Sequence, residues 1–319
     1  MRRHDSHLHR RGPLLVLPFL VAALLWGRTA AASDFTSGGS FLPLGHGARA
    51  HALGGAGTGL LRDDSAAYWN PANLAWLGHR NGITVMHADI LPGVDDGYDT
   101  ASFARSRGER LGEPTQRIRP TRWGYGLFFS HLGFDFASGN GWAENVVQVG
   151  LGAAVNNFAT VGIGVKGLFL GNDFDSGGAS GAGFDLGVAV LLVDDITAAV
   201  VGRDVWTRLS WDTSKWETLA PSVTLGFEYR PGARWTGEVD FVLREGTAQR
   251  AAVGLEWQAF RDLLWLRGGL TVVTPGGRRT FPSAGAGVGL SHFVLDYGVS
   301  FDGEDDFEEG HRISLRAMF

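Results

Sequence analysis

The sequence has no cysteine and, after its first 32 residues, no second long apolar run. Without thiols an exported chain cannot rely on disulfides, so its stability has to come from a packed core or from strand pairing. Because a membrane helix needs about 20 apolar residues, no transmembrane helix is expected after Ser33. The net charge of -5 is small, and no basic stripe marks a nucleic-acid partner. Glycine, with 48 residues, is about twice as frequent as usual.

The first 32 residues have the pattern of a secretory signal peptide. Four arginines among the first eleven residues precede an apolar run from Leu14 to Trp26, and the small residues Ala30 to Ala32 follow. A basic start, a short apolar centre and an A-x-A end predict cleavage after Ala32. A retained anchor is the alternative, although the run is short for a membrane span.

From about Gly82 onward the apolar residues recur with a period of two. One example is the run Val223, Leu225, Phe227 and Tyr229, whose intervening residues are Thr224, Gly226, Glu228 and Arg230. Such alternation is typical of strands with two unlike faces. We count about fourteen such segments, starting near Gly82, Tyr98, Arg122, Ala143, Ala159, Gly181, Asp195, Ala220, Ala233, Thr247, Leu264, Thr280, Phe293 and His311.

The connections between these segments favour a membrane barrel. Short links such as 156–158 and 193–194 alternate with longer polar links such as 171–180 and 302–310. Outer-membrane barrels have short turns at one end and long loops at the other. A soluble β-sandwich also alternates, but its outer face would carry many more Lys, Glu and Thr. The sequence therefore predicts an all-β fold, a transmembrane antiparallel β-barrel of about 14 strands over residues 81–319, in the outer membrane of a diderm bacterium.

Two stretches of the predicted barrel stand out. The charged segment 106–121 is long, yet the strand count places it among the short turns, so it is either an insertion or the sign of a misplaced strand. The chain ends on an alternating strand in which Ile313, Leu315, Ala317 and Phe319 would face lipid. The terminal Phe319 resembles the signal by which the barrel assembly machinery recognises its substrates.

Residues 33–80 do not alternate and are predicted to form a separate segment. Ala48 to Leu53 favours one helical turn ended by Gly54 and Gly55. Asp63 or Asp64 is a candidate cap for a second short helix that ends before Pro71. A loose periplasmic arm is the alternative to a packed segment.

The same region resembles a known family. The strings GARA at 47–50, LGGA at 53–56 and DDSAAYWNPANLA at 63–75 are similar to the N-terminal signature of FadL-like proteins, most closely the PorV/PorQ group. The last strand, from His311 to Phe319, resembles that group as well. These matches cover about a fifth of the chain, at its two ends. The resemblance implies a fourteen-stranded barrel with residues 33–80 folded into the lumen as a hatch, whose gating region would comprise Asp63, Asp64, Tyr68, Trp69, Asn70, Pro71 and Ala72.

Chemistry in the predicted lumen points to structure more than to catalysis. No metal-ligand spacing is present, no cofactor is expected, and the chain is not expected to be an enzyme. Glu238 and Asp240 share a face, as two catalytic carboxylates would, but structural pairing is the simpler interpretation. The neighbours Ser130-His131 and Ser291-His292 would point to opposite faces of a strand and form no dyad. The polar side chains expected to face the lumen are Lys166, Asp185, Glu228, Glu238, Asp240, Glu256, Arg267, Asp296, Arg312 and Arg316.

Three functions remain open at this stage. The FadL resemblance implies a passive channel for hydrophobic solutes such as long-chain fatty acids, with Phe128, Leu168 and Trp265 as inward apolar contacts. The PorV/PorQ resemblance implies an accessory of type IX secretion that contacts secretion-system proteins. Its working surface would be an outer loop containing Trp206, Trp211 and Trp216, which could equally be an aromatic girdle. A structural outer-membrane protein in contact with lipid alone is the third possibility.

Overall fold

The computed structural model describes residues 42–60, 62–78, 81–89, 95–112, 118–135, 139–173, 177–260, 263–301 and 310–319. The predicted signal peptide, residues 33–41 and the acidic stretch 302–309 lie outside these ranges. Among the described residues, no helix is long and apolar enough to cross a membrane. The helical segments are η2 (Leu42–Leu44), α2 (Ala48–Ala52), α3 (Ala66–Trp69) and η3 (Pro71–Trp76).

The remaining elements are strands. They are β1 (Asn81–Ala88), β2 (Asp95–Arg110), β3 (Thr121–Asp135), β4 (Gly141–Ala154), β5 (Ala159–Asn172), β6 (Ala179–Val193), β7 (Ile196–Trp211), β8 (Trp216–Glu217), β9 (Ser222–Tyr229), β10 (Trp235–Arg244), β11 (Thr247–Phe260), β12 (Leu264–Val273), β13 (Arg279–Leu290), β14 (Phe293–Ser300) and β15 (Gly310–Met318).

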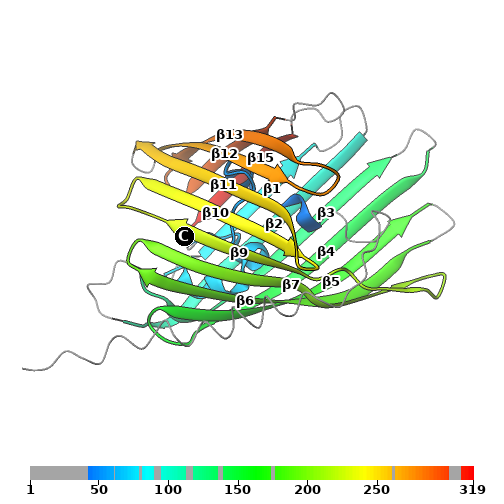
Figure 1. The fold of residues 1–319 in the computed structure, drawn as a ribbon, viewed down its shortest axis with the longest axis horizontal. Coiled ribbons are helices and arrows are strands. Elements are labelled where there is room, and N and C mark those ends of the chain that lie inside the picture. The colour runs from blue at the N-terminus through cyan, green and yellow to red at the C-terminus, as the bar shows by residue number, and fades with distance from the viewer. Residues whose placement is uncertain are drawn as a thin grey trace, which may run out of the picture.

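These strands close into one antiparallel barrel (Figure 1). Apart from β8, each strand pairs with the next. β7 pairs directly with β9, and β1 pairs with β15, where Val85 lies opposite Leu315. The two-residue β8 pairs only with the end of β7 and is not part of the wall. Fourteen wall strands therefore confirm the predicted fold, and each begins within three residues of its predicted start.

The wall has the polarity of a membrane barrel. Outward positions carry large apolar side chains that are half exposed, such as Val165 at 54% and Leu255 at 52%. Inward positions carry buried polar groups, and all ten of the predicted lumen residues are buried. Outward aromatic residues flank the apolar band at both ends, as in outer-membrane barrels. Those at the short-turn end include Trp123, Tyr229, Trp235, Trp257 and Phe319, and those at the long-loop end include Phe169, Trp206, Phe241 and Tyr297.

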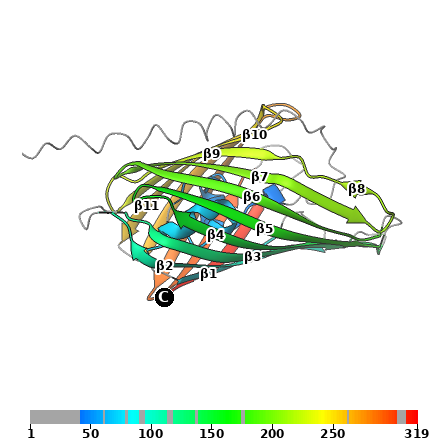
Figure 2. The same cartoon turned by 90° about the horizontal axis from the view of Figure 1, so that it is seen from below.

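The barrel is longer on one side. Strands β2 to β7 have 14 to 16 residues, whereas β1, β9, β10 and β12 to β15 have 8 to 12. Figure 2 shows the long strands extending together past the rest at the long-loop end. The extra length of β2 resolves the ambiguity over segment 106–121, because the strand continues to Arg110 and the link covers only 111–120.

The N-terminal segment lies inside this wall. Figures 1 and 2 show its helical turns in the lumen, and most of its apolar side chains between Ala48 and Leu77 are buried. We call residues 42–78 the hatch. As predicted, α2 ends at two glycines with positive φ, Gly54 and Gly55. The helix α3 ends before Pro71 because the residue preceding proline, Asn70, is extended, with φ -160° and ψ 109°.

The predicted helix cap is corrected by the structure. The residue before α3 is Ser65, and neither Asp63 nor Asp64 occupies the capping position. Asp63 instead accepts hydrogen bonds from the backbone N–H and the hydroxyl of Ser65. Asp64 accepts a hydrogen bond from Thr84 on β1 at 2.5 Å. Asp63 thus binds a neighbour in its own turn, whereas Asp64 binds a wall strand that the local sequence pattern does not reveal.

Candidate functional site

The Asn70-Pro71-Ala72 turn is fixed by its own side chain and by the wall. The Asn70 side-chain carbonyl accepts the backbone N–H of Ala72 at 3.0 Å, which caps η3. Its amide donates to the backbone carbonyl of Val188 on β6 at 3.2 Å. Nearby, the amide of Asn73 donates to the carbonyls of Thr58 and Leu60 within the hatch. The two asparagines therefore join the hatch to itself and to the wall through hydrogen bonds between uncharged groups.

A row of glycines lies under this turn. Gly124, Gly152, Gly162 and Gly187 are in register across β3 to β6, so each faces the next in the ladder. A Cβ at Gly162 would lie 2.3 Å from the Ala72 nitrogen, and one at Gly152 would lie 2.5 Å from the Pro71 carbonyl oxygen. The hatch backbone thus packs directly on the strand backbone, which only glycine allows. This contact explains much of the glycine on the inward face.

A chain of ion pairs joins the hatch to the opposite wall. Arg49 of α2 pairs with Asp63 and, at 2.8 Å, with Glu256 of β11. Arg267 of β12 pairs with Glu256 and with Asp296 of β14, both at 2.6 Å. Arg316 of β15 completes the chain on Asp296, again at 2.6 Å. Three cations alternate with three carboxylates, so this buried network is neutral.

A second polar group lies on β5 to β7. Lys166 contacts Asp185 at 2.8 Å and Asp204 at 2.7 Å. The amide of Gln148 donates to Asp185 and to the Ala67 carbonyl of the hatch, at 3.3 and 2.9 Å. Asp204 belongs to a bulge opposite Asp185 and has a φ of 52°. This group also attaches the hatch to the wall, through Gln148.

Among the described residues, four wall arginines donate to backbone carbonyls of the hatch: Arg110, which contacts Gly78 at its end, and three that face the lumen. Arg203 donates to the Trp69 carbonyl at 3.1 Å, and its guanidinium stacks over Tyr68 at 4.6 Å. Arg250 donates to the Gly55 carbonyl at 3.0 Å, and Arg312 donates to the Leu44 carbonyl at 2.6 Å. Charged donors make these bonds stronger than neutral ones. The hatch is therefore bound around its circumference.

Three carboxylates meet on β9 and β10. Glu228 and Glu238 face each other across the ladder, and Asp240 follows on the same face. Asp240 accepts the backbone N–H groups of Gly57 and Thr58 at 3.0 and 3.1 Å. Glu238 is fully buried, and within the described part of the chain neither of its oxygens has a hydrogen-bond partner. Among the described residues, the group therefore contains one carboxyl that no hydrogen-bond donor contacts.

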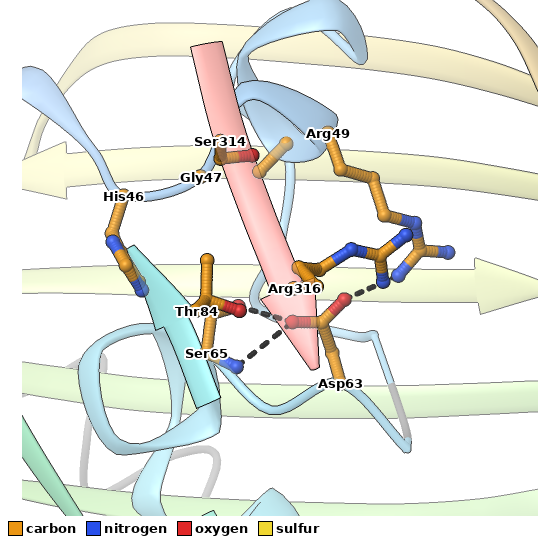
Figure 3. A pocket seen from close by; sticks show the side chains of 9 residues that line it. His46, Gly47, Arg49, Asp63, Ser65, Thr84, Ser314 and Arg316 are labelled. Carbon is orange, nitrogen blue, oxygen red and sulfur yellow. Dashed lines mark hydrogen bonds and ion pairs between the residues drawn. The ribbon is translucent and has the colours of Figure 1, made fainter. Parts of the chain in front are cut away.

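The junction of hatch, β1 and β15 encloses a small cavity (Figure 3). About 10 Å³ is open there, which is room for about one water molecule. His46 lines it, and its ring nitrogens bond Thr100 and Ser102 at 2.7 and 2.8 Å. Burial lowers the pKa of His46 to about 4, so the ring is neutral at physiological pH.

The adjacent acids of the hatch titrate differently. Burial alone would raise the pKa of Asp63, but Arg49 and Arg316 hold it below its usual range. Burial and the neighbouring charge of Asp63 raise the pKa of Asp64 to about 6. One of two consecutive carboxyls is therefore firmly ionised, while the other takes up a proton under mildly acidic conditions.

The aromatic residues of the hatch pack against Phe128. Its ring centroid lies 4.9 Å from that of Tyr68 and 5.2 Å from that of His46. Trp69 stands edge-on to Tyr68, also at 4.9 Å, and its indole N–H donates to the His46 carbonyl at 3.0 Å. Phe128 faces inward as predicted, and its side chain is buried within the hatch contact.

Leu168 belongs to a different group, which we call the loop-end apolar cluster. It lines the inner face of the long strands and contains Met86, Tyr98, Leu132, Val146, Leu168, Leu170, Leu209 and Leu219, with Leu44, Phe134, Trp142 and Trp211 packed against it. Trp265 lies at the start of β12, at the short-turn end of the barrel, and is only half-buried. The three predicted apolar contacts, Phe128, Leu168 and Trp265, therefore lie in different parts of the lumen.

The structure revises two smaller predictions. Trp206 and Trp211 are on β7 rather than in a loop, and Trp211 packs on the loop-end apolar cluster. Trp216 is 61% exposed, with the Arg208 guanidinium 3.5 Å from its ring centroid. The three tryptophans do not form one surface. Ser291 and His292 form a turn rather than part of a strand, and their side chains hydrogen-bond at 2.9 Å.

No protein-family model matches the sequence, and no curated protein matches it. Solved structures do. The CymD monoaromatic hydrocarbon channel aligns with a TM-score of 0.65 and 12% identity, over 87% of this chain and 98% of the other. The Pseudomonas putida toluene transporter TodX aligns with a TM-score of 0.58 and 14% identity, over 86% and 97%. A Pseudomonas aeruginosa FadL homologue aligns with a TM-score of 0.58 and 15% identity, over 85% and 97%.

The chain has the fold of the FadL-like barrels. At these identities the likeness concerns the fold alone, and it covers nearly the whole of each related barrel. It supports the broader FadL-like resemblance but gives no support to the narrower PorV/PorQ one.

Several residues of this FadL-like lumen were missed from the sequence. Arg49 lies within the quoted GARA string, but its partner Glu256 is 207 positions away. Arg250 shares its strand face with the predicted residue Glu256, so alternation alone could have found it. Asp204 has an even number on a strand whose odd-numbered residues face inward, and only the bulge turns it toward Lys166.

Proposed function

We propose that this protein is a passive outer-membrane channel for small hydrophobic solutes. The observation that carries the proposal is the loop-end apolar cluster, which makes part of the lumen wall apolar. Barrel interiors are ordinarily polar, as befits pores for water-soluble molecules. An apolar inner face instead favours solutes that gain free energy by leaving water.

The position of the cluster supports the same proposal. It lies on the long strands at the long-loop end, with the hatch next to it through Leu44. A hydrophobic solute arriving from that end would displace apolar side chains and then meet the hatch. The related structures named as hydrocarbon channels and as a FadL homologue support this solute class, whereas the choice between aromatic hydrocarbons and long-chain fatty acids stays a proposal.

The gate of the proposed channel is the hatch turn at Asn70, Pro71 and Ala72. Uncharged hydrogen bonds and glycine contacts hold this turn, whereas α2 is held by ion pairs. Uncharged hydrogen bonds contribute about 1 kcal/mol each, and bonds to charged groups contribute more. We therefore propose that Asn70 to Ala72 moves during passage, while the ion pair of Arg49 with Asp63 and the bond from Arg203 to the Trp69 carbonyl keep the hatch attached.

Solute uptake by whole cells tests this function. The probe is radiolabelled oleate, offered to a diderm host that lacks its own fatty-acid channel and has intact lipopolysaccharide. Leu168→Gln places a polar group in the loop-end apolar cluster and is expected to lower uptake at least fivefold. Leu290→Gln, at a 72% exposed position at the short-turn end of β13, is the matched control and should leave uptake unchanged.

Native mass spectrometry of the protein from its own membrane separates the competing functions. Retained apolar molecules, lost on Leu168→Gln, are the expected result. A stoichiometric protein partner without any small ligand would favour the secretion accessory instead. Equal uptake of both oleate and a monoaromatic hydrocarbon, with and without the folded protein, would reject the channel.

A further inference from the structure

Five arginines gather at the short-turn end of β2 and β3. We call Arg105, Arg107, Arg110, Arg119 and Arg122 the arginine cluster. Three of them follow one another along the end of β2, and the other two flank the start of β3. In the ladder, Arg105 faces Tyr125, Arg107 faces Trp123 and Arg110 faces Thr121. The charged segment that the sequence left unexplained is therefore one structural feature.

The local backbone directs these side chains to the surface. The ladder between β2 and β3 is irregular between Arg107 and Arg110, where Gly108 has a φ of 90°. Beside it, Arg122 and Trp123 are both exposed although they are consecutive. Arg107 and Arg110 are exposed as well, while Arg105 and Arg119 are half-buried. Alternation thus places Arg105 and Arg107 on the outside of the barrel, and the irregularity adds Arg110 and Arg122 to the same surface.

Within the part of the chain that the structure describes, little compensates these charges. Arg110 donates to the Gly78 carbonyl at 2.6 Å and Arg119 to the Gly112 carbonyl at 3.4 Å. Within the described residues none of the five forms an ion pair, and Glu109 is the sole acid of 105–112 and 118–123. The chain as a whole has more acids than bases, 33 against 28. Such a concentration of free donors is complementary to an anion.

The position of the arginine cluster along the barrel indicates which anion it can meet. Outward on the same two strands lie Phe103 and Leu127, which face each other just above Arg105 and Tyr125. Leu127 is 48% exposed and belongs to the lipid-facing band, and Trp123, 43% exposed, belongs to the aromatic girdle that borders it. Arg105 and Arg107 therefore lie at the depth of lipid headgroups. Guanidinium groups bind phosphate oxygens through paired hydrogen bonds, and clustered arginines near a membrane bind anionic lipid.

We propose that the arginine cluster binds the phosphates of anionic phospholipids in the leaflet at the short-turn end. Trp123 and Tyr125 pack against the acyl chains, and Arg105, Arg107 and Arg122 hold the headgroup. The bound lipid covers the irregular end of the β2–β3 ladder. These three arginines lie outside the lumen and take no part in the proposed solute passage.

Lipid titration followed by native mass spectrometry tests the site. The full-length protein in mild detergent is offered dioleoyl phosphatidylglycerol or dioleoyl phosphatidylcholine, and bound lipids are counted. The test variant is Arg105→Gln with Arg107→Gln and Arg122→Gln; Arg110 is kept because it bonds Gly78. The control variant removes equal charge at the long-loop end, through Arg244→Gln, Arg278→Gln and Arg279→Gln. All three positions of the control are exposed, and folding of every variant is checked by heat-modifiable gel mobility.

The wild-type protein and the control are expected to retain phosphatidylglycerol in preference to phosphatidylcholine. The triple variant should lose that preference at least fivefold. If the triple variant does not fold, the single variants Arg107→Gln and Arg107→Lys are compared instead. The lysine variant should keep most of the preference for phosphatidylglycerol, and the glutamine variant should lose it. Unchanged lipid retention in the folded triple variant, or displacement of the lipid by millimolar inorganic phosphate, overturns the proposal. So does an acidic protein that binds the cluster while phosphatidylglycerol does not.

Discussion

Glu238 lies in an environment that does not provide what its side chain requires. Its carboxylate is buried between Glu228 and Asp240, and neither oxygen has a partner among the described residues. Burying a charge without donors costs free energy, and the like charges beside it add to that cost. By contrast, Glu256 on the neighbouring β11 is held by both Arg49 and Arg267. Two glutamates of one lumen thus stand in opposite electrostatic situations.

Glu238→Gln is expected to stabilise the folded barrel by about 1–3 kcal/mol, the usual cost of an unsatisfied buried group. The amide keeps the shape and supplies donors to the adjacent carboxylates. Urea unfolding in lipid vesicles, followed by tryptophan fluorescence, measures the change. Glu256→Gln is the matched control and should destabilise the barrel, because it leaves two arginines with less compensation. A loss of stability in both variants would contradict this interpretation.

The pair Asp63 and Asp64 predicts a pH effect with a defined sign. Because the pKa of Asp64 rises to about 6 in the hatch, the folded protein binds a proton that the unfolded chain releases above about pH 4. Its ionisation therefore destabilises the fold above pH 6, and this cost disappears as the pH falls to about 4. Asp64→Asn should gain about 2 kcal/mol at pH 8 and almost nothing at pH 4.

Unfolding in vesicles at several pH values checks this prediction. Asp63→Asn serves as its counterpart, because Arg49 and Arg316 lower the pKa of Asp63 and its charge stabilises the fold at neutral pH. That variant should lose stability at pH 8. A gain for Asp64→Asn that does not depend on pH would show that the effect arises from packing rather than ionisation.

At the scale of elements, the glycine row beneath η3 explains why the hatch fits a wall of β3 to β6. The ladder registers align Gly124, Gly152, Gly162 and Gly187 into one smooth strip. The helical turn is short, yet its backbone reaches the strands because no side chain stands between them. Since the hydrogen bonds of Asn70 depend on this approach, the strip and the cap act together.

Gly162→Ala should displace the hatch turn from the wall, because the added Cβ would lie 2.3 Å from the Ala72 nitrogen. We expect limited proteolysis of the hatch to become at least tenfold faster while the barrel keeps its heat-modifiable mobility. Gly171→Ala on the same strand β5 is the control, since its Cβ would meet nothing within 4 Å. Equal protease resistance in the two variants would show that strand β5, rather than the hatch turn, shifts to accommodate the added Cβ.

At the scale of the whole molecule, the closed barrel puts its two kinds of link at opposite ends. β7 is an example: this single strand runs from the short turn at Asp194 to the longer link that begins at Asp212. Its outward face is apolar in the middle and bears Trp206 toward the long-loop end. An outer-membrane orientation therefore places residue 213 outside the cell and residue 194 in the periplasm.

The absence of cysteine makes this orientation directly testable. Thr213→Cys and Asp194→Cys each introduce a single thiol at an exposed position at one end of β7. A membrane-impermeant maleimide added to intact cells should modify Thr213→Cys and leave Asp194→Cys unmodified until the cells are opened. Modification of Asp194→Cys alone in intact cells would mean that the barrel is inserted the other way.

The sequence by itself determined the wall. A period of two, apolar on one side and small or polar on the other, is a local property of each segment and does not depend on which strand pairs with it. The fourteen strands, and which of their side chains face the lumen, could therefore be predicted. The ten lumen residues follow from the same alternation, and so does the outward facing of Phe319, which is 62% exposed. Helix ends at Gly54 and before Pro71 are equally local, since they depend on backbone sterics.

Only the tertiary structure decided which of these residues meet. Arg49 finds Glu256 because the hatch lies inside the closed wall, and Asp204 reaches Lys166 because a bulge reverses its side. Phe128, Leu168 and Trp265 share an inward direction but lie at different heights, so facing alone did not bring them together. The arginine cluster likewise needed the irregular β2–β3 ladder to become one surface. Pairing across a barrel depends on register and closure, and no local pattern in the chain encodes either.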